Sequence, residues 1–277
     1  MPDVTPPLPE AHVRKLAQKL VDGHLALFVG AGISHLARRK DGTEGRLPLW
    51  GELRRQIANN CLGEEADEFS NPLELFDAVV VEHDRGTLET EVRRLIDDRP
   101  YEPSSAHQDL AQIPWRDVFT TNYDGLLERS LAKSPVVSER DYDRIRDEAR
   151  PRLFQIHGTL KNPHTLTRDD YRLWDRKHPR AIHELKDVFL NGSVLFVGYG
   201  MNDPHLDTLL EKVREMTRGY ERRFYAWTWQ TSQRKRQMLD RNDRIESVNL
   251  LEETDWAAAF RQLLEAYKEL RLSLIHI

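Results

Sequence analysis

Short apolar runs, each ended by glycine or polar residues, recur along the chain and predict buried β-strands. Five runs are strongly apolar and a sixth is weaker; they cover residues 25–29, 118–121, 153–156, 194–197, 224–228 and 245–250. Inner strands of a parallel sheet are covered on both faces, so they read as continuous apolar runs. Helical periodicity between these runs completes an alternation of strands and helices. The pattern predicts an α/β fold, a doubly wound Rossmann-like parallel sheet.

Helical segments also predict how the chain is divided. Residues 10–21 and 256–270 open and close the series, and residues 124–131 and 207–216 lie between strands. About 85 residues separate the first two strands, too many for a simple crossover. Because residues 50–60, 72–84 and 87–96 look amphipathic and helical, we expect a small helical lobe inserted over about 50–105.

A second insertion is expected over about 164–190, where Tyr171, Trp174 and Phe189 are expected to cover one edge of a cleft. Residues 1–9 include four prolines and predict a flexible lead. The main domain then covers residues 10–271.

Composition excludes several classes of protein. Lys and Arg total 41 against 46 Asp and Glu, and the net charge of −5 is mixed along the chain, so direct nucleic acid binding is not expected. No apolar stretch approaches the ~20 residues of a membrane span, and the acidic start does not resemble a signal peptide. A single cysteine, Cys61, rules out internal disulfides and a multi-cysteine zinc site. A cytoplasmic protein is the simplest expectation.

The last residues, 272–277, read Leu-Ser-Leu-Ile-His-Ile. One reading frame of a common sequencing-library adaptor encodes this peptide. We therefore expect the tail to be an adaptor artefact and the natural chain to continue past about residue 271.

The first predicted strand leads into Gly30-Ala31-Gly32-Ile33-Ser34. Glycine lets a backbone turn sharply and approach a phosphate, and the helix that follows offers free N–H groups. The usual dinucleotide fingerprint needs glycine or alanine where this chain has His35. Taken alone, the segment is also compatible with a purely structural glycine turn.

The second predicted strand runs into Asn122-Tyr123-Asp124. An amide and a carboxylate two residues apart are able to face one ligand, and both are costly to bury unpaired. The alternative is a cap for the next helix, since Asp124 precedes Leu126 and Leu127.

Two further strands end in unusual polar segments. The third ends in His157-Gly158, where the glycine leaves room for the imidazole ring, and the fourth in Gly198-Tyr199-Gly200 running to Asp203. Each alone is also compatible with a packed histidine or a tight turn. In a doubly wound sheet, however, the carboxyl ends of the strands form the ligand crevice, and four such clusters predict one shared site.

In order and spacing these residues resemble the sirtuin superfamily, and specifically its bacterial SIR2-like branch. The shared signatures are the Gly-Ala-Gly-x-Ser loop, the Asn-x-Asp segment and the His-Gly pair; Leu47-Pro48-Leu49-Trp50 and the segment from Phe196 to Pro204 resemble the branch. The likeness covers roughly residues 11–251 and implies an NAD-binding domain.

Departures from the protein deacylases of the superfamily narrow the implied activity. The chain lacks their Gly-x-Pro-Asp-Phe-Arg segment, has Thr121 where they have glutamine, and cannot build their four-cysteine zinc ribbon. The resemblance therefore implies an NAD glycohydrolase that acts without metal. Such an enzyme releases nicotinamide and ADP-ribose, as in SIR2-like effectors of bacterial anti-phage defence.

The resemblance also implies roles for individual residues. Asn122, Asp124 and His157 are the expected catalytic group, with His157 taking a proton near neutral pH. The residues expected to bind NAD are Gly30, Ala31, Gly32, Ser34, Thr121, Gly198, Tyr199 and Asp203.

Two other functions use the same cleft. A non-catalytic module would sense NAD or ADP-ribose, and an ADP-ribosyltransferase would pass the sugar to another acceptor. Because constant NAD loss harms a cell, an NAD hydrolase implies control by homo-oligomerisation or by a partner defence protein.

Overall fold

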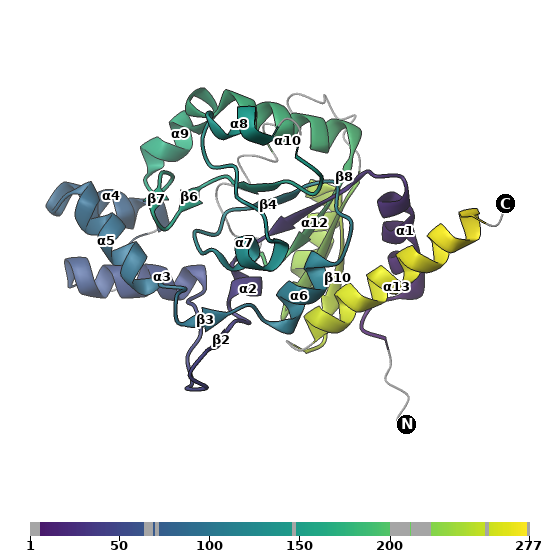
Figure 1. Ribbon diagram of the computed structural model, residues 1–277. Helices are drawn as coiled ribbons and strands as arrows, with labels where there is room; N and C mark the ends of the chain where they lie inside the picture. Colours follow the sequence, from purple (N-terminus) through teal and green to yellow (C-terminus); the bar gives the residue numbers. More distant parts are fainter. Residues whose placement is uncertain are drawn as a thin grey trace.

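The computed structural model describes residues 6–63, 69, 72–145, 148–199, 211, 223–252 and 255–275. Its centre is a six-stranded sheet, all parallel, in the order β10-β9-β8-β1-β4-β5 (Figure 1). The strands are β1 (Leu25–Val29), β4 (Val118–Thr120), β5 (Leu153–Gln155), β8 (Ser193–Val197), β9 (Phe224–Trp229) and β10 (Ile245–Leu250). All six predicted strands are confirmed, and the fold is α/β with a doubly wound sheet.

Strand order places a switch point beside β1. The chain adds β4 and β5 on one side of β1, then returns to add β8, β9 and β10 on the other side. The crevice of such a sheet lies at the carboxyl ends of the strands where the order reverses. Here that place is the edge between β1 and β8.

The register brings the ends of four strands to this edge. Val29, at the end of β1, pairs with Thr120 and with Val197, and Thr120 in turn pairs with Gln155. The segments after β1, β4, β5 and β8 therefore all begin at one level of the sheet.

Helices cover both faces of the sheet. Leu25, Leu27 and Val29 pack in one cluster with α1 (Glu10–Val21), α6 (Ser105–Ala111) and α13 (Asp255–Ile275). Ala26 and Phe28 point to the opposite cluster with α10 (Pro179–Asn191) and α12 (Gln233–Asp243). Successive residues of a strand face opposite sides, so a fully buried β1 needs apolar residues throughout.

The inserted helices have an apolar cluster of their own. They are α3 (Trp50–Ile57), the π-helical turn η1 (Ala58–Leu62), α4 (Pro72–Glu82) and α5 (Arg85–Leu95), and they share buried Phe76, Val79, Leu88 and Val92. The predicted helix over 50–60 begins at Trp50 but changes to a π-turn at Ala58, before left-handed Gly63 (φ 66°). The short strands β2 (Arg38–Arg39) and β3 (Tyr101–Glu102) pair at the base of the insertion.

The second insertion begins with a hairpin and continues as two helices. β6 (Gly158–Thr159) pairs with β7 (Asn162–Pro163), and α9 (Arg168–Lys177) leads into α10. Trp174 and Phe189 are buried, whereas Tyr171 is half-buried. The boundaries of both insertions and of the main domain stay predictions.

The remaining helices are short or terminal. The helix α2 (Ala31–Ser34) follows β1, α7 (Leu126–Leu131) follows β4, and α8 (Asp141–Arg144) precedes β5. The closing helix α13 enters the tail 272–277, where Leu272 and Leu274 are exposed. The predicted helix over 207–216 lies almost entirely outside the described residues. No helix in the described part of the chain is long and apolar enough to cross a membrane.

Candidate active site

A cavity of about 440 Å³ lies at the carboxyl edge of the sheet, beside the switch point. Nine of the residues expected to form the site line it: Ala31, Gly32, Ser34, Thr121, Asn122, Asp124, His157, Gly198 and Tyr199. Gly30 does not line it, and Asp203 lies outside the described residues. The structure thus brings together segments that are more than 160 residues apart in the chain.

The hydroxyl of Ser34 connects the two polar residues after β4. The Asn122 Nδ2 donates to Ser34 Oγ at 2.9 Å, and Ser34 Oγ donates to Asp124 Oδ2 at 2.8 Å. All three side chains are buried. Since a buried amide or carboxylate is costly without a partner, this bridge makes the cluster stable enough to form.

Asp124 also supports the helix that follows. Its Oδ1 accepts the N–H of Leu126 at 3.1 Å, where α7 begins. The helix-cap interpretation and the shared-site interpretation therefore both apply to this residue. Burial raises the pKa of Asp124 to about 6, and the bond from Ser34 opposes that rise only in part.

Gln155 holds the Asn122–Asp124 segment in place, a role that the sequence analysis did not assign. Its Nε2 donates to the backbone oxygens of Asn122, at 3.2 Å, and of Asp124, at 2.9 Å. Gln155 is almost fully buried at the end of β5. A polar residue inside an apolar strand was the available signal, because it needs a buried partner.

The glycines of the first turn permit a close approach to the turn after β8. The N–H of Gly30 donates to Val197 O at 2.9 Å, and that of Gly32 to Gly198 O at 2.8 Å. A Cβ at Gly30 would lie 2.6 Å from Gly198 O. These glycines are therefore required by backbone packing, and two of the N–H groups expected to face phosphate are already engaged.

The turns after β4 and β8 also meet through side chains. The hydroxyls of Thr121 and Tyr199 lie 3.2 Å apart, within hydrogen-bonding distance. Both residues line the cavity, so they form part of its wall between the two turns.

His157 follows β5 and faces the same cavity. Its backbone oxygen accepts the N–H groups of His164 and Thr165, at 3.1 and 3.2 Å, which folds the β6–β7 hairpin back beside it. Gly158 has φ 97°, and a Cβ there would lie 2.2 Å from Asn162 O. The glycine after His157 is thus required by the hairpin rather than by the imidazole ring.

Three more cavity residues lie outside the set expected to bind NAD or to act in catalysis. Arg54 is the one Lys or Arg side chain among the described residues that line the cavity. The indole nitrogen of Trp50 is buried and has no hydrogen-bond acceptor among the described residues. Tyr171 comes from α9 and contacts His157. Tyr171 was expected at the edge of a cleft and does line the cavity, whereas no sequence pattern marked Arg54, which reaches the cavity only through the packing of an insertion.

A second, more open cavity of about 930 Å³ lies beside the β2–β3 pair and the starts of α6 and α13. None of the residues expected to form the site lines it. In the described part of the chain, no cluster of three or more His, Cys, Asp or Glu side chains is placed to hold a metal ion.

Comparison with known protein families gives a match over part of the chain. Residues 116–250 match the family model described as SIR2-like domain. The match includes Asn122, Asp124, His157 and the turn after β8.

Similar proteins extend the likeness toward the N-terminus. The chain is 25% identical over 232 residues to NAD(+) hydrolase ThsA of Bacillus cereus (strain MSX-D12), which covers 79% of this chain and 46% of that protein. For NAD(+) hydrolase ThsA of Acinetobacter baumannii (strain 532279), the identity is 27% over 77% of this chain and 44% of the relative. Defense-associated sirtuin 2 of Bacillus subtilis is 24% identical over 74% of this chain and 20% of its own length. The chain spans less than half the length of these relatives.

Replacing Asp124 with asparagine is expected to change how stability depends on pH. The folded pKa of about 6 lies above the unfolded value of about 3.9, so the folded state binds the proton more tightly. The free energy of unfolding of the wild-type protein therefore includes a contribution that falls by about 3 kcal/mol as the pH rises from about 4 to about 6. Asparagine cannot ionise, so D124N lacks this fall.

Urea unfolding of both proteins at several pH values measures the difference. The stability of D124N relative to wild type should increase by about 3 kcal/mol across that window. D169N, at a position with a 77% exposed side chain, is the control and should follow wild type. If the free energies of unfolding of D124N and wild type change with pH in parallel, the Asp124 carboxyl does not have a raised pKa in the folded protein.

Proposed function

The chain carries a SIR2-like domain, and from this premise we propose that it is an NAD+ hydrolase, cleaving NAD+ to nicotinamide and ADP-ribose. The observation that supports this most is the single cavity shared by Asn122, Asp124, His157 and the turns after β1 and β8. Relatives named NAD(+) hydrolase ThsA add support from outside the chain. Those relatives are named for this activity, and for this chain the activity is our proposal.

The reaction breaks the bond between nicotinamide and C1′ of the ribose and forms a bond from water oxygen to the same carbon. The nicotinamide nitrogen keeps the electron pair and leaves as a neutral molecule, and the attacking water releases one proton. Positive charge grows on the ribose in an oxocarbenium-like transition state, as in glycoside hydrolysis. The site must therefore orient a water, accept a proton and stabilise the positive charge.

We assign Asn122 the role of hydrogen-bonding the attacking water or a ribose hydroxyl. Its nitrogen is fixed by Ser34, which sets the plane of the carboxamide and leaves the oxygen as the atom for the substrate. An acceptor held in one orientation by the protein lowers the entropic cost of reaching the transition state. Ser34 thus acts through Asn122 as well as lining the cavity.

His157 and Asp124 supply the remaining chemistry. We assign the imidazole of His157 to accept the proton that the attacking water releases. Asp124 is ionised above pH of about 6, and its negative charge in a water-poor site stabilises the positive ribose. The Asp124 carboxylate is also able to accept a hydrogen bond from the amide N–H of nicotinamide.

In this proposal, the turns after β1, β4 and β8 and the inserted helices bind the dinucleotide. We assign the diphosphate to the side of the cavity formed by Ala31, Gly32 and Ser34, and the adenosine to the side of Thr121, Gly198 and Tyr199. Gly30 contributes by letting the two turns pack. Because the N–H groups of Gly30 and Gly32 are engaged with β8, the diphosphate needs another source of positive charge, and Arg54 provides it.

We place the enzyme in bacterial antiviral defence; the B. subtilis relative, a defence-associated sirtuin by name, supports a role in defence. NAD loss has to be controlled, so the proposal includes a homo-oligomer or a partner defence protein that holds the domain inactive. Its substrate makes the cytoplasm the proposed location.

Asn122→Ala and His157→Ala should each reduce nicotinamide release from NAD+ by at least about a hundredfold, because each removes a group that acts in the transition state. Product separation on purified protein measures the rate, and thermal unfolding shows that the variants fold. Asn59→Ala and His183→Ala, at exposed positions outside the cavity, are the matched controls. Wild-type turnover in the site variants would exclude these roles, whereas NAD+ binding with no product from the activated, full-length wild type would favour the sensor module.

Arg54→Gln should raise KM for NAD+ by about tenfold or more with little change in kcat, because it removes a charged hydrogen-bond donor that serves binding. The KM of R54Q should also depend less on salt concentration than that of wild type. Arg55→Gln is the matched control, since Arg55 is exposed on the same helix and does not line the cavity. Equal KM values for R54Q and R55Q would contradict the assignment.

A further inference from the structure

The half-buried ring of Tyr171 packs against the ring of His157. Their centroids lie 5.3 Å apart with the planes at 69°, an edge-to-face arrangement, and both residues line the 440 Å³ cavity. Tyr123 is a second aromatic neighbour of His157, at 6.2 Å. Aromatic contacts of this geometry favour one orientation of the ring. The orientation of the imidazole therefore depends on where α9 places Tyr171.

The position of α9 is in turn set by Asp170, the residue before Tyr171. Its Oδ2 accepts the N–H groups of Leu166 and Thr167, at 3.1 and 3.2 Å, and its own N–H donates to Thr167 Oγ1 at 3.4 Å. This reciprocal pairing is a capping box that fixes the first turn of the helix. Asp170 is buried, with 7% of its surface exposed.

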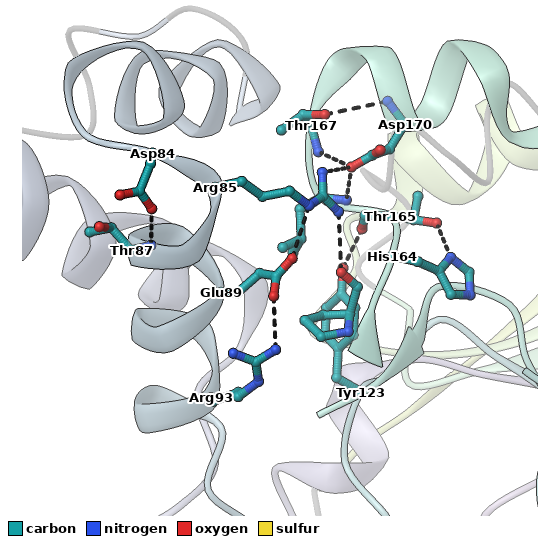
Figure 2. Close-up of polar contacts among 12 residues, drawn as sticks. Asp84, Arg85, Thr87, Glu89, Arg93, Tyr123, His164, Thr165, Thr167 and Asp170 are labelled. Atoms are coloured by element: carbon teal, nitrogen blue, oxygen red, sulfur yellow. Dashed lines mark hydrogen bonds and ion pairs between the residues drawn. The ribbon is translucent and has the colours of Figure 1, made fainter. Parts of the chain in front are cut away.

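A charge on the helical lobe completes this arrangement. Arg85, the first residue of α5, donates from Nη1 to Asp170 Oδ2 at 2.7 Å, and from Nε to Glu89 Oε1 at 2.9 Å (Figure 2). Burial alone would raise the pKa of Asp170, but the bond from Arg85 and those from the backbone N–H groups of Leu166 and Thr167 lower it. Lys177, on the same helix as Asp170, also lies 3.5 Å from Asp170 Oδ1, whereas Arg85 is the charged partner on α5. Because a buried carboxylate that loses a charged partner destabilises the fold, the Arg85–Asp170 pair holds α5 and α9 in one arrangement.

The same helix also holds the hairpin that follows His157. Arg93 Nε donates to Leu160 O at 2.8 Å, and Arg85 Nη2 donates to Pro163 O at 3.3 Å. Glu89 accepts from both arginines and joins them into one network, as Figure 2 shows. The Tyr123 hydroxyl donates to Thr165 O in the same region. Both the chain after His157 and the helix that faces its ring are thus attached to α5.

We infer that Tyr171 is a positioning residue for His157, and that the ion pair between Arg85 and Asp170 positions Tyr171. The inference rests on the proposed function, because it concerns the orientation of the group assigned to take the water proton. A misplacement of about 1 Å in a reacting group is enough to reduce a rate by about a hundredfold. Losing the Arg85–Asp170 contact, which lies away from the reacting atoms, should therefore change the orientation of the His157 ring.

Nuclear magnetic resonance of the histidine side chains tests the contact without any need for turnover. The ring protons of His157, assigned by their loss in His157→Gln, experience the ring current of Tyr171. Tyr171→Leu should shift them, Tyr171→Phe should retain their positions, and Asp170→Asn should shift them in the same direction as Tyr171→Leu. Asp169→Asn is the matched control, one residue away in the same helix turn but exposed, and should leave them in place.

Kinetics test the consequence for the reaction. Tyr171→Leu and Asp170→Asn should each lower kcat for NAD+ by about tenfold to a hundredfold, and KM should stay within about threefold because His157 is not assigned to binding. Arg85→Gln leaves the backbone bonds of Asp170 intact and serves if Asp170→Asn does not fold. Because Asp170 and Tyr171 are inferred to act through the same contact with His157, the double variant Tyr171→Leu/Asp170→Asn should have a kcat no lower than that of the more impaired single variant.

The outcomes separate the two proposals. If wild type does not cleave NAD+ even in the activated, full-length assembly, the proposed function fails, while the resonance shifts still decide whether Tyr171 orients His157. If Tyr171→Leu leaves the His157 resonances unchanged, the positioning role is overturned whatever the activity. If Tyr171→Leu shifts them but Asp170→Asn and Arg85→Gln do not, the role of the ion pair is overturned.

Discussion

The hydroxyl of Ser34 is the contact on which the site depends. It donates to Asp124 and accepts from Asn122, and so connects the turn after β1 to the turn after β4 inside the protein. Without it, an amide and a carboxylate would be buried with fewer partners, at a cost comparable to a large part of the stability of a domain. Because Ser34 accepts one bond and donates the other, both polar groups stay in the cavity wall, where burial raises the pKa of the Asp124 carboxyl to about 6.

The sheet explains why these turns meet. With β1 between β4 and β8, two turns flank the end of one strand, and the glycines let the backbones approach closely enough to exchange hydrogen bonds. The inserted helices then supply what the turns lack. The lobe contributes the charge of Arg54 and, through Arg85, the position of the helix that carries Tyr171. The candidate site is therefore built from the edge of the sheet and from both insertions.

Much of this arrangement could be predicted from the sequence because it depends on local pattern. The inner strand β1 has the predicted bounds, since burial on both faces requires an uninterrupted apolar run. The meeting of Asn122, His157 and Gly32 at one cavity followed from a rule about parallel sheets rather than from any single motif.

The remaining features depend on packing that no local pattern encodes. Arg85 and Asp170 are 85 positions apart and lie in separate insertions, so nothing in either segment indicates the other. Gln155 looked like an ordinary strand residue until its two backbone acceptors were in place. The glycine turn was interpreted through phosphate binding, whereas its first requirement is the approach of the β8 turn. Sequence patterns predicted which segments meet, and the side-chain partners emerged only with the fold.

A crystal structure of the His157→Ala variant with NAD+ tests the central claim most directly. We expect the nicotinamide–ribose bond within hydrogen-bonding reach of Asn122, with the diphosphate beside Gly32 and Arg54. Density for the dinucleotide in the larger cavity beside the β2–β3 pair, with no contact to Asn122, would contradict it.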